Sequence, residues 1–150
     1  MPSRLAIDWF PGTDPRVREA LAVRFEVFVH EQGFPADQEV DDLDAIACHV
    51  VAWHDGKPVA TARLATLDAT RVQLGRVAVL PEFRRQGLAT RLLELLLELA
   101  RREGYQHAEL RSQIEAIPVY ERLGFVAEGP WTLEADVPHR LMRRAIAPLG

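Results

Sequence analysis

The chain has 150 residues, which is enough for one domain with a substantial hydrophobic core. Hydrophobic residues make up 48% of the chain and charged residues 27%, a balance typical of a soluble globular protein. The formal net charge is −4, which argues against general binding of nucleic acid.

Cysteine content and hydropathy narrow the class further. Cys48 is the only cysteine, so the chain has neither an intramolecular disulfide nor a cysteine-cluster zinc site. Cys48 lies in a predicted strand, which favours a buried, inert thiol. No segment has the ~20 apolar residues of a membrane span, and the N-terminus has no apolar run of signal-peptide length. We therefore expect a cytoplasmic protein that binds neither nucleic acid nor a membrane.

A strand and a helix are predicted first. Residues 5–10 ("LAIDWF") favour a strand, which ends at Pro11. Asp14 can cap the following helix, and Pro15 suits its first position. Apolar residues then recur at helical spacing, namely Val17, Leu21, Phe25 and Phe28.

An acidic segment at residues 33–45 follows and predicts an irregular loop. Such a segment is usually solvated, although it is also suited to attract a cationic amine. Its carboxylates are Asp37, Glu39, Asp41, Asp42 and Asp44.

Three strands are predicted next. Residues 47–53 and 58–65 are strand-like, and Asp55-Gly56 between them is a strong hairpin signal. Residues 65–80 contain a second turn and then another strand, which ends at Pro81.

The second half predicts two helices and three strands. A helix begins near Leu88 and stops at Gly104, with apolar positions Leu88, Leu92, Leu95, Leu96 and Leu99. The remaining elements are a strand at 107–112, a short helix at 116–124, and strands at 125–129 and 139–146. The whole chain, residues 1–150, is therefore predicted to be a single α/β (α+β) domain with a mixed sheet and helices on both faces.

The turn at residues 84–89 contains Arg84 and Arg85, directly before the predicted Leu-rich helix. A helix N-terminus already carries unpaired N–H groups and partial positive charge. Two further cations are favourable there only if an anion such as a phosphate binds. Gly87 and Ala89 are small enough for a ligand to approach the backbone.

Known nucleotide motifs do not explain this turn. A Walker loop is absent, and a dinucleotide fingerprint needs three spaced glycines where only Gly87 is found. Taken alone, the turn is equally well explained by two solvated arginines, because charged residues are common in turns.

Two motifs resemble the GNAT acetyltransferase superfamily. Arg84, Gly87 and Ala89 match its Arg/Gln-x-x-Gly-x-Gly/Ala signature. Residues 113–125 ("QIEAIPVYERLGF") are similar to its Asn-x-x-Ala-x-x-x-Tyr…Gly-Phe segment, with Gln113 where Asn is common.

Further blocks resemble the ElaA-like subgroup, so that the similarity covers nearly the whole chain. They are "VRFEVFVHEQGFPADQEVDDLD", "HVVAW", "ATARL", "GRVAV" and "VPHRLM". The resemblance implies a mostly antiparallel sheet of about seven strands. It also implies that residues 76–80 and 107–112 form parallel neighbouring strands, which splay apart to admit a cofactor.

The implied activity is direct transfer of an acetyl group from acetyl-CoA, as co-substrate, to a primary amine on a small molecule or peptide. Backbone N–H groups of the turn would bind the CoA pyrophosphate, and the preceding strand would pair with the pantetheine arm. The implied CoA-binding residues are Val77, Ala78, Val79, Arg84, Arg85, Gln86, Gly87, Leu88, Ala89, Thr90 and Gln113.

No metal is expected. His49 and His54 are five residues apart in a predicted strand, so they point to opposite faces.

Tyr120 matches the family residue that lies near the CoA sulfur and can protonate or hydrogen-bond the departing thiolate. Alternatively, Tyr120 is an aromatic residue that only packs in the core. Glu31 and His139 are candidates for the general base. However, Glu31 is at least as well explained as a surface carboxylate, and His139 as a polar residue at the end of a strand. Ordered water is a third candidate.

An alternative to the enzyme is a non-catalytic acyl-CoA-binding sensor or scaffold domain, which would keep the cofactor site without turnover.

The residues do not identify the acceptor amine. A homodimer is possible, because dimers are frequent in such families.

Overall fold

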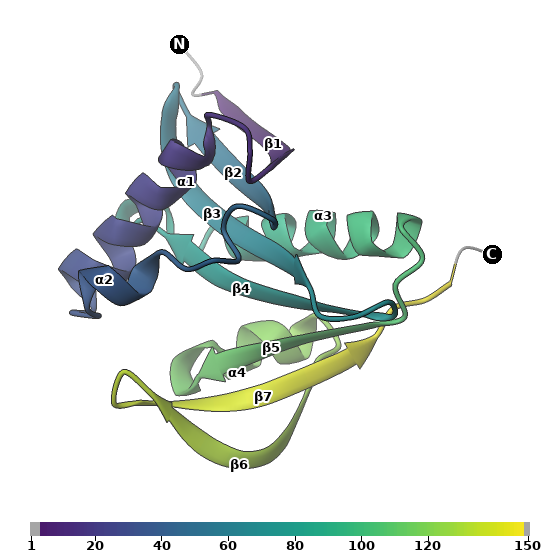
Figure 1. The fold of residues 1–150 in the computed structure, drawn as a ribbon. Coiled ribbons are helices and arrows are strands. Elements are labelled where there is room, and N and C mark those ends of the chain that lie inside the picture. The colour runs from purple at the N-terminus through teal and green to yellow at the C-terminus, as the bar shows by residue number, and fades with distance from the viewer. Residues whose placement is uncertain (1–3, 149–150) are drawn as a thin grey trace.

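A seven-stranded mixed sheet forms the centre of the molecule (Figure 1) in the computed structural model, which describes residues 4–148. The strands are β1 (Leu5–Pro11), β2 (Cys48–His54), β3 (Lys57–Thr66), β4 (Arg71–Val79), β5 (His107–Gln113), β6 (Val126–Glu134) and β7 (Val137–Ala145). Their spatial order is β1-β2-β3-β4-β5-β7-β6. Among the described strands, only β4 and β5 pair in parallel. The predicted fold class is confirmed.

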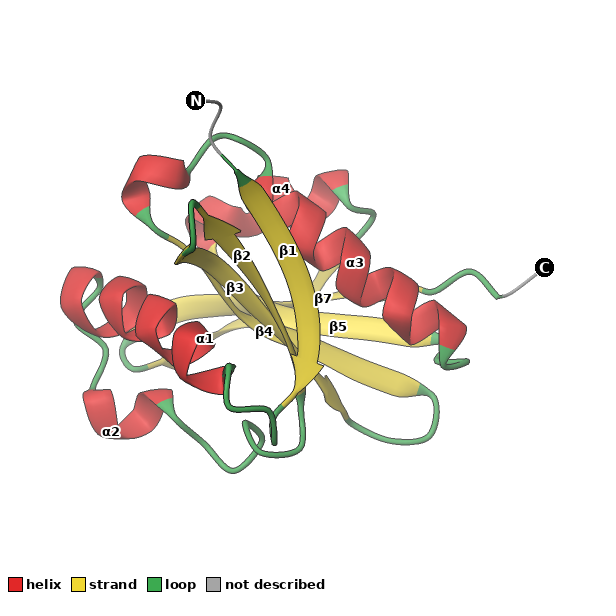
Figure 2. Cartoon of the chain, turned by 90° about the horizontal axis from the view of Figure 1, so that it is seen from above, coloured by secondary structure: helices red, strands yellow, loops and turns green. Residues whose placement is uncertain are grey.

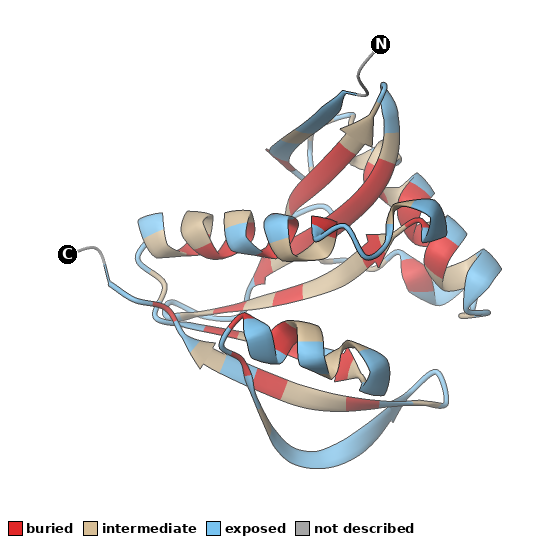
Figure 3. Cartoon of the chain, turned by 180° about the vertical axis from the view of Figure 1, so that it is seen from behind, coloured by how far each residue is buried: buried red, intermediate tan, exposed pale blue. Residues whose placement is uncertain are grey.

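Helices cover both faces of this sheet (Figure 2). They are α1 (Val17–Arg24), α2 (Ala36–Glu39), α3 (Leu88–Arg102) and α4 (Ile117–Arg122). Residues 59–63 of β3 are buried without a break, as expected for a strand that is covered on both sides. At the far edge, β6 is almost wholly exposed (Figure 3).

The first helix differs from its prediction in start, shape and buried face. It begins at Val17 and continues as a π-helix over Phe25–Glu31. Its buried residues are Ala20, Val23, Arg24 and Val27, whereas the predicted apolar positions are only half-buried. Small residues pack closely against the sheet here, and the charge of Arg24 is compensated by carboxylates. The spacing of apolar residues in the sequence predicts neither the close packing of small residues nor the burial of a compensated arginine.

The acidic segment is not a solvated loop throughout. Residues Ala36–Glu39 form the short helix α2. The carboxylates of Glu39 and Asp44 are buried, because buried arginines neutralise them.

The predicted hairpin turn at Asp55-Gly56 and the predicted helix stop at Gly104 are confirmed. At the β2–β3 hairpin, Asp55 and Gly56 have φ of 50° and 84°, as a two-residue type I′ turn requires. At the end of α3, Gly104 has φ of 86° and its N–H donates to the Arg101 carbonyl at 3.1 Å. The Tyr105 N–H donates to the Ala100 carbonyl, which completes a Schellman motif.

The strands β4 and β5 are neighbours over only three residue pairs. The first pair is Arg71 with His107 and the last is Gln73 with Glu109. Beyond these pairs the strands diverge (Figure 1), and a bulge at Arg76 shifts the pairing of β4 with β3. The predicted parallel pair is confirmed, but its hydrogen-bonded residues precede the predicted 76–80.

No helix within residues 4–148 has the length and apolar character needed to cross a membrane.

Candidate active site

A cavity of about 970 Å³ opens where β4 and β5 diverge. Its wall includes residues from the π-helix, α2, α4 and the β6–β7 turn. It brings together six of the residues predicted from sequence, namely Val77, Arg84, Arg85, Gln113, Tyr120 and His139. The other predicted CoA-binding residues belong to β4, the following turn and the start of α3 but do not line this wall, and they are Ala78, Val79, Gln86, Gly87, Leu88, Ala89 and Thr90.

The turn before α3 is open to a ligand. Residues 84–87 are exposed, and no side chain in the described part of the chain caps the helix. The Arg91 N–H donates to the Gly87 carbonyl at 3.0 Å, so the N–H groups of Gly87 through Thr90 precede the first intrahelical bond. Gly87 has φ of 77°, and no atom lies within 4 Å of a Cβ built there. This geometry suits an anion at the backbone.

The two arginines of the turn differ in their contacts. Arg84 donates from Nη1 to Glu31 Oε2 at 2.7 Å and from Nε to the Val79 carbonyl at 2.9 Å. Its second terminal nitrogen donates to the other oxygen of Glu31. Within residues 4–148, no hydrogen bond or ion pair engages the Arg85 side chain. Arg85 is therefore the cation that remains available to an anion at the turn.

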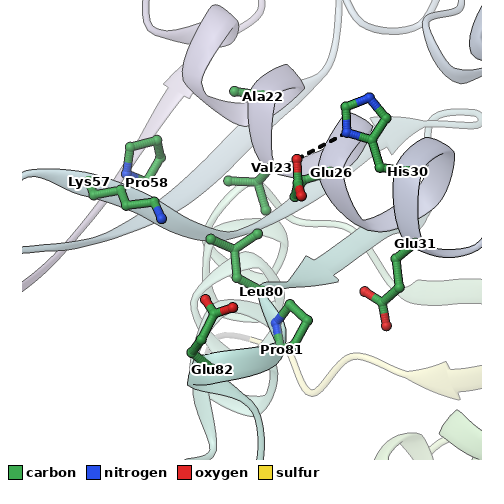
Figure 4. A pocket seen from close by; sticks show the side chains of 10 residues that line it. All are labelled: Ala22, Val23, Glu26, His30, Glu31, Lys57, Pro58, Leu80, Pro81 and Glu82. Atoms are coloured by element: carbon green, nitrogen blue, oxygen red, sulfur yellow. Dashed lines mark hydrogen bonds and ion pairs between the residues drawn. The ribbon is translucent and has the colours of Figure 1, made fainter.

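Glu31 lies in the ion pair with Arg84 rather than at the wall of the large cavity. It lines a smaller cavity of about 570 Å³ (Figure 4), together with Glu26 and His30, which are hydrogen-bonded to each other at 3.1 Å. The hydrogen bond from Arg84 lowers the pKa of Glu31, which makes its carboxylate a weaker base.

Tyr120 lies on α4 and is only 8% exposed. Its ring packs edge-on against Phe125, with centroids 6.3 Å apart. Burial raises its pKa to about 12. The hydroxyl therefore stays protonated at neutral pH, and no residue of the described chain hydrogen-bonds to it.

His139 is buried on β7, and its ring orientation is fixed at one nitrogen. Nδ1 lies 2.8 Å from the Val137 carbonyl and 3.3 Å from Glu134 Oε2. A carbonyl only accepts, so Nδ1 carries the proton and the neutral ring has its lone pair on Nε2. The neighbouring strand residue Gln113 donates to Gln32 at 3.0 Å, which ties the cavity wall to the end of the π-helix.

A buried charge cluster, which the sequence did not reveal, borders the cavity. We call it the arginine–carboxylate cluster, and its members are Arg24, Glu39, Asp41, Asp44, Arg63 and Arg76. Arg24 lies 2.6 Å from a carboxylate oxygen of Glu39 and 2.6 Å from one of Asp44. Arg63 lies 2.7 Å from Asp41 and 2.9 Å from Asp44. Two of its arginines, Arg63 and Arg76, lie inside the strand patterns "ATARL" and "GRVAV". A charged residue within an apolar strand was the one signal in the sequence that could have indicated this cluster.

The remaining candidates do not join the site. Burial raises the pKa of Cys48 to about 11, so its thiol is a poor nucleophile at neutral pH. His49 is buried, and its Nε2 lies 2.9 Å from the Asp44 carbonyl. Among residues 4–148, no three His, Cys, Asp or Glu side chains are grouped to hold a metal ion.

A splayed parallel strand pair, two arginines of the turn before α3 and a buried tyrosine meet at one cavity, as the resemblance to acyl-CoA-dependent transferases implies. Comparison with known proteins agrees. A family model described as the Acetyltransferase (GNAT) family matches residues 15–125. The chain is 32% identical over 132 residues to the uncharacterised N-acetyltransferase YjcF of Bacillus subtilis, covering 87% of this chain and 94% of YjcF.

Solved structures give the same result. An acyl-CoA N-acyltransferase from Pseudomonas aeruginosa is 37% identical with a TM-score of 0.85, over 95% of this chain and all (100%) of that one. Escherichia coli ElaA is 25% identical with a TM-score of 0.84, over 94% of this chain and 99% of that one. The chain belongs to the GNAT acetyltransferase family, and its substrates are accordingly an acyl-CoA and an acceptor.

Proposed function

We propose that the chain is an N-acetyltransferase that moves an acetyl group from acetyl-CoA directly to a primary amine. The observation that carries this proposal is the cavity between β4 and β5, which has Arg84 and Arg85 of the turn before α3, and Tyr120, at its wall. Family membership supports an acyl-CoA as the donor substrate, and the names of the similar proteins favour nitrogen as the acceptor atom.

The turn would hold the CoA pyrophosphate mainly through backbone N–H groups of residues 84–89, with Thr90 close by. Arg85 is available to pair with the anion, while Arg84 already pairs with Glu31. The edge of β4 at Val77–Val79 would pair with the pantetheine arm, because β5 does not pair there. Gln113 would close the far side of this opening.

Tyr120 would act as the general acid. Expulsion of CoA leaves a thiolate, and a neighbouring hydroxyl can donate a proton to it. The raised pKa of Tyr120 keeps that proton available at neutral pH.

His139 is our preferred base. A primary amine with a pKa of ~10.4 must lose a proton before attack, which costs roughly 4–5 kcal/mol at neutral pH. The lone pair on His139 Nε2 can accept that proton directly or through water. Glu31 is less suitable, because Arg84 holds its carboxylate and lowers its pKa.

The test is release of CoA from acetyl-CoA across a broad panel of primary amines, beside a calorimetric titration with acetyl-CoA. Turnover on at least one amine supports the enzyme. Binding of acetyl-CoA without turnover on any amine would instead support a sensor or scaffold domain. A protein that binds no acetyl-CoA would contradict both.

A further inference from the structure

Arg76 occupies a strained position at the wall of the large cavity. It lies at the bulge of β4 with φ of 50°, a left-handed conformation that is uncommon for residues other than glycine. Such conformations cost of order 1–3 kcal/mol and are concentrated at functional sites. The bulge places its guanidinium against the α2 segment, where it lines the cavity and remains 29% exposed.

Its protein partners leave part of the guanidinium without an acceptor. Arg76 donates to the Glu39 carbonyl at 3.3 Å and to Asp41 at 3.2 Å. Within residues 4–148, nothing accepts from its Nη1. His49 Nδ1 is the only buried side-chain polar atom there that lacks a partner, so Arg76 Nη1 is open to solvent.

The two carboxylates nearest to Arg76 lie closer to other arginines. Glu39 lies 2.6 Å from Arg24 and Asp41 lies 2.7 Å from Arg63, both closer than either lies to Arg76. Burial lowers the pKa of Arg76, and the charge of nearby Arg63 lowers it further. By contrast, hydrogen bonds to Asp44 and Glu39 raise the pKa of Arg24 despite its burial. An additional anion beside Arg76 would therefore be stabilising.

The proposed cofactor site would bring the reacting acyl group close to Arg76. Arg76 lies three residues before Val79, or ~10 Å along the strand. A cofactor held at residues 84–89 and running back along β4 would therefore have its acyl end near Arg76. Tyr120 and His139 line the same cavity.

We propose that Arg76 binds a carboxylate carried by the acceptor, so that the acceptor class is amines with a free carboxylate, such as amino acids. This inference rests on the proposed acetyltransferase function. Nη1 has no acceptor among residues 4–148, and a charge-assisted hydrogen bond from it to a carboxylate is roughly twice as strong as a neutral one, so it would anchor the carboxylate end of the acceptor. The amine of such an acceptor would then be directed at the thioester.

The experiment compares pairs of primary amines that have the same chain length and differ only in a carboxylate, with amine–carboxylate spacings from α- to ω-amino acids. For at least one spacing, kcat/KM should favour the carboxylate by ~10- to 100-fold, the usual value of a hydrogen bond to a charged group. Arg76→Gln should abolish this preference and leave acetyl-CoA affinity unchanged. Arg76→Lys should retain part of it.

Arg111→Gln is the matched control, because Arg111 lines the same cavity from β5 but is exposed and on a regular strand. It should retain the preference. The proposal is overturned if the parent protein shows no preference at any spacing. It is also overturned if Arg76→Gln keeps the preference or if Arg111→Gln alone removes it.

Two further measurements test the proposal if Arg76→Gln folds poorly or if no amine is acetylated. Short alkyl carboxylates should inhibit the parent protein competitively against the amine, whereas the matching alcohols should not. If no amine is acetylated, the proposed function fails, and calorimetric binding of the same carboxylates to the parent protein tests Arg76 separately. Binding that Arg76→Gln removes supports the anion site, and no binding to the parent protein overturns it.

Discussion

Burial gives Tyr120 the protonation state that an acid requires, because a phenol with a pKa of about 12 keeps its proton at neutral pH. Tyr120→Phe removes the hydroxyl but keeps the ring against Phe125. We expect kcat to fall by ~10²–10⁴-fold. Acetyl-CoA affinity and Tm should remain nearly unchanged. Steady-state kinetics on the best amine, with a titration of acetyl-CoA, measure this.

Tyr105→Phe is the control for that variant. The Tyr105 hydroxyl bonds to Thr66 at 2.8 Å and is not part of the cavity wall. Its removal should leave kcat unchanged. Equal turnover by Tyr120→Phe and the parent protein would make Tyr120 a packing residue.

Replacing the two candidate bases should have different effects. His139→Gln should lower kcat by ~10²–10⁴-fold, because the proposed base is removed. Glu31→Gln should keep kcat within a few-fold, because the ion pair with Arg84 already weakens the carboxylate as a base. Steady-state kinetics of both variants decide the assignment, and a large loss in Glu31→Gln alone would reverse it.

At the scale of elements, most of the sheet followed from local pattern. Apolar runs, the Asp55-Gly56 turn and the stop at Gly104 predicted the order of strands and helices along the chain and the crossover helix, because each signal is local. The two family motifs predicted which elements meet at the cavity. Six of the predicted residues lie on its wall.

The π-helix and the arginine–carboxylate cluster were not predictable in the same way. A π-helix over Phe25–Glu31 has no periodic signature of its own in the sequence. The burial of Arg24 depends on Glu39 and Asp44, which are 15 and 20 residues away. Such long-range compensation appears only when the segments are packed together.

The α3 turn depends on backbone geometry, and Gly87→Val tests it. At φ of 77° a β-branched residue is strained, and its side chain would occupy the space where the anion approaches. Acetyl-CoA affinity should fall by at least ~10-fold, given a cost of ~1–2 kcal/mol for the left-handed conformation plus the lost contact. Arg84→Ala should have a smaller effect, because Arg84 pairs with Glu31.

Gly129→Val is the matched control, since Gly129 has φ of 75° and equally open surroundings but lies on β6. It should bind acetyl-CoA normally. Unchanged affinity in Gly87→Val would count against a phosphate site at this turn.

At the scale of the whole molecule, the arginine–carboxylate cluster joins α1, α2 and the segment before β2 to the strands β3 and β4. Arg24 comes from α1, Glu39 from α2, and Asp44 from the segment before β2. Arg63 and Arg76 come from β3 and β4. Three arginines face three carboxylates, so each carboxylate is needed to keep the buried charges balanced.

Asp44→Asn tests this balance through the pH dependence of stability. Burial alone would raise the pKa of Asp44, but hydrogen bonds and charge from Arg24 lower it from 3.8 to about 2. A lowered pKa in the folded state stabilises the protein above about pH 4, and this contribution is lost as the pH falls towards 2. At neutral pH the variant should lose ~3–5 kcal/mol, because Arg24 keeps a buried charge with one partner fewer.

The difference in unfolding free energy between the parent protein and Asp44→Asn should therefore shrink by ~2 kcal/mol between about pH 4 and pH 2. Asp68→Asn is the control. The pKa of Asp68 is also lowered to about 2, chiefly by the Arg71 hydrogen bond, but this pair is exposed. High salt should screen the effect of Asp68 and leave that of Asp44 in place, since buried pairs are screened much less. Urea titrations across this pH range at low and high salt measure both. Equal salt sensitivity of the two variants would show that the Asp44 pair is as solvated as a surface ion pair.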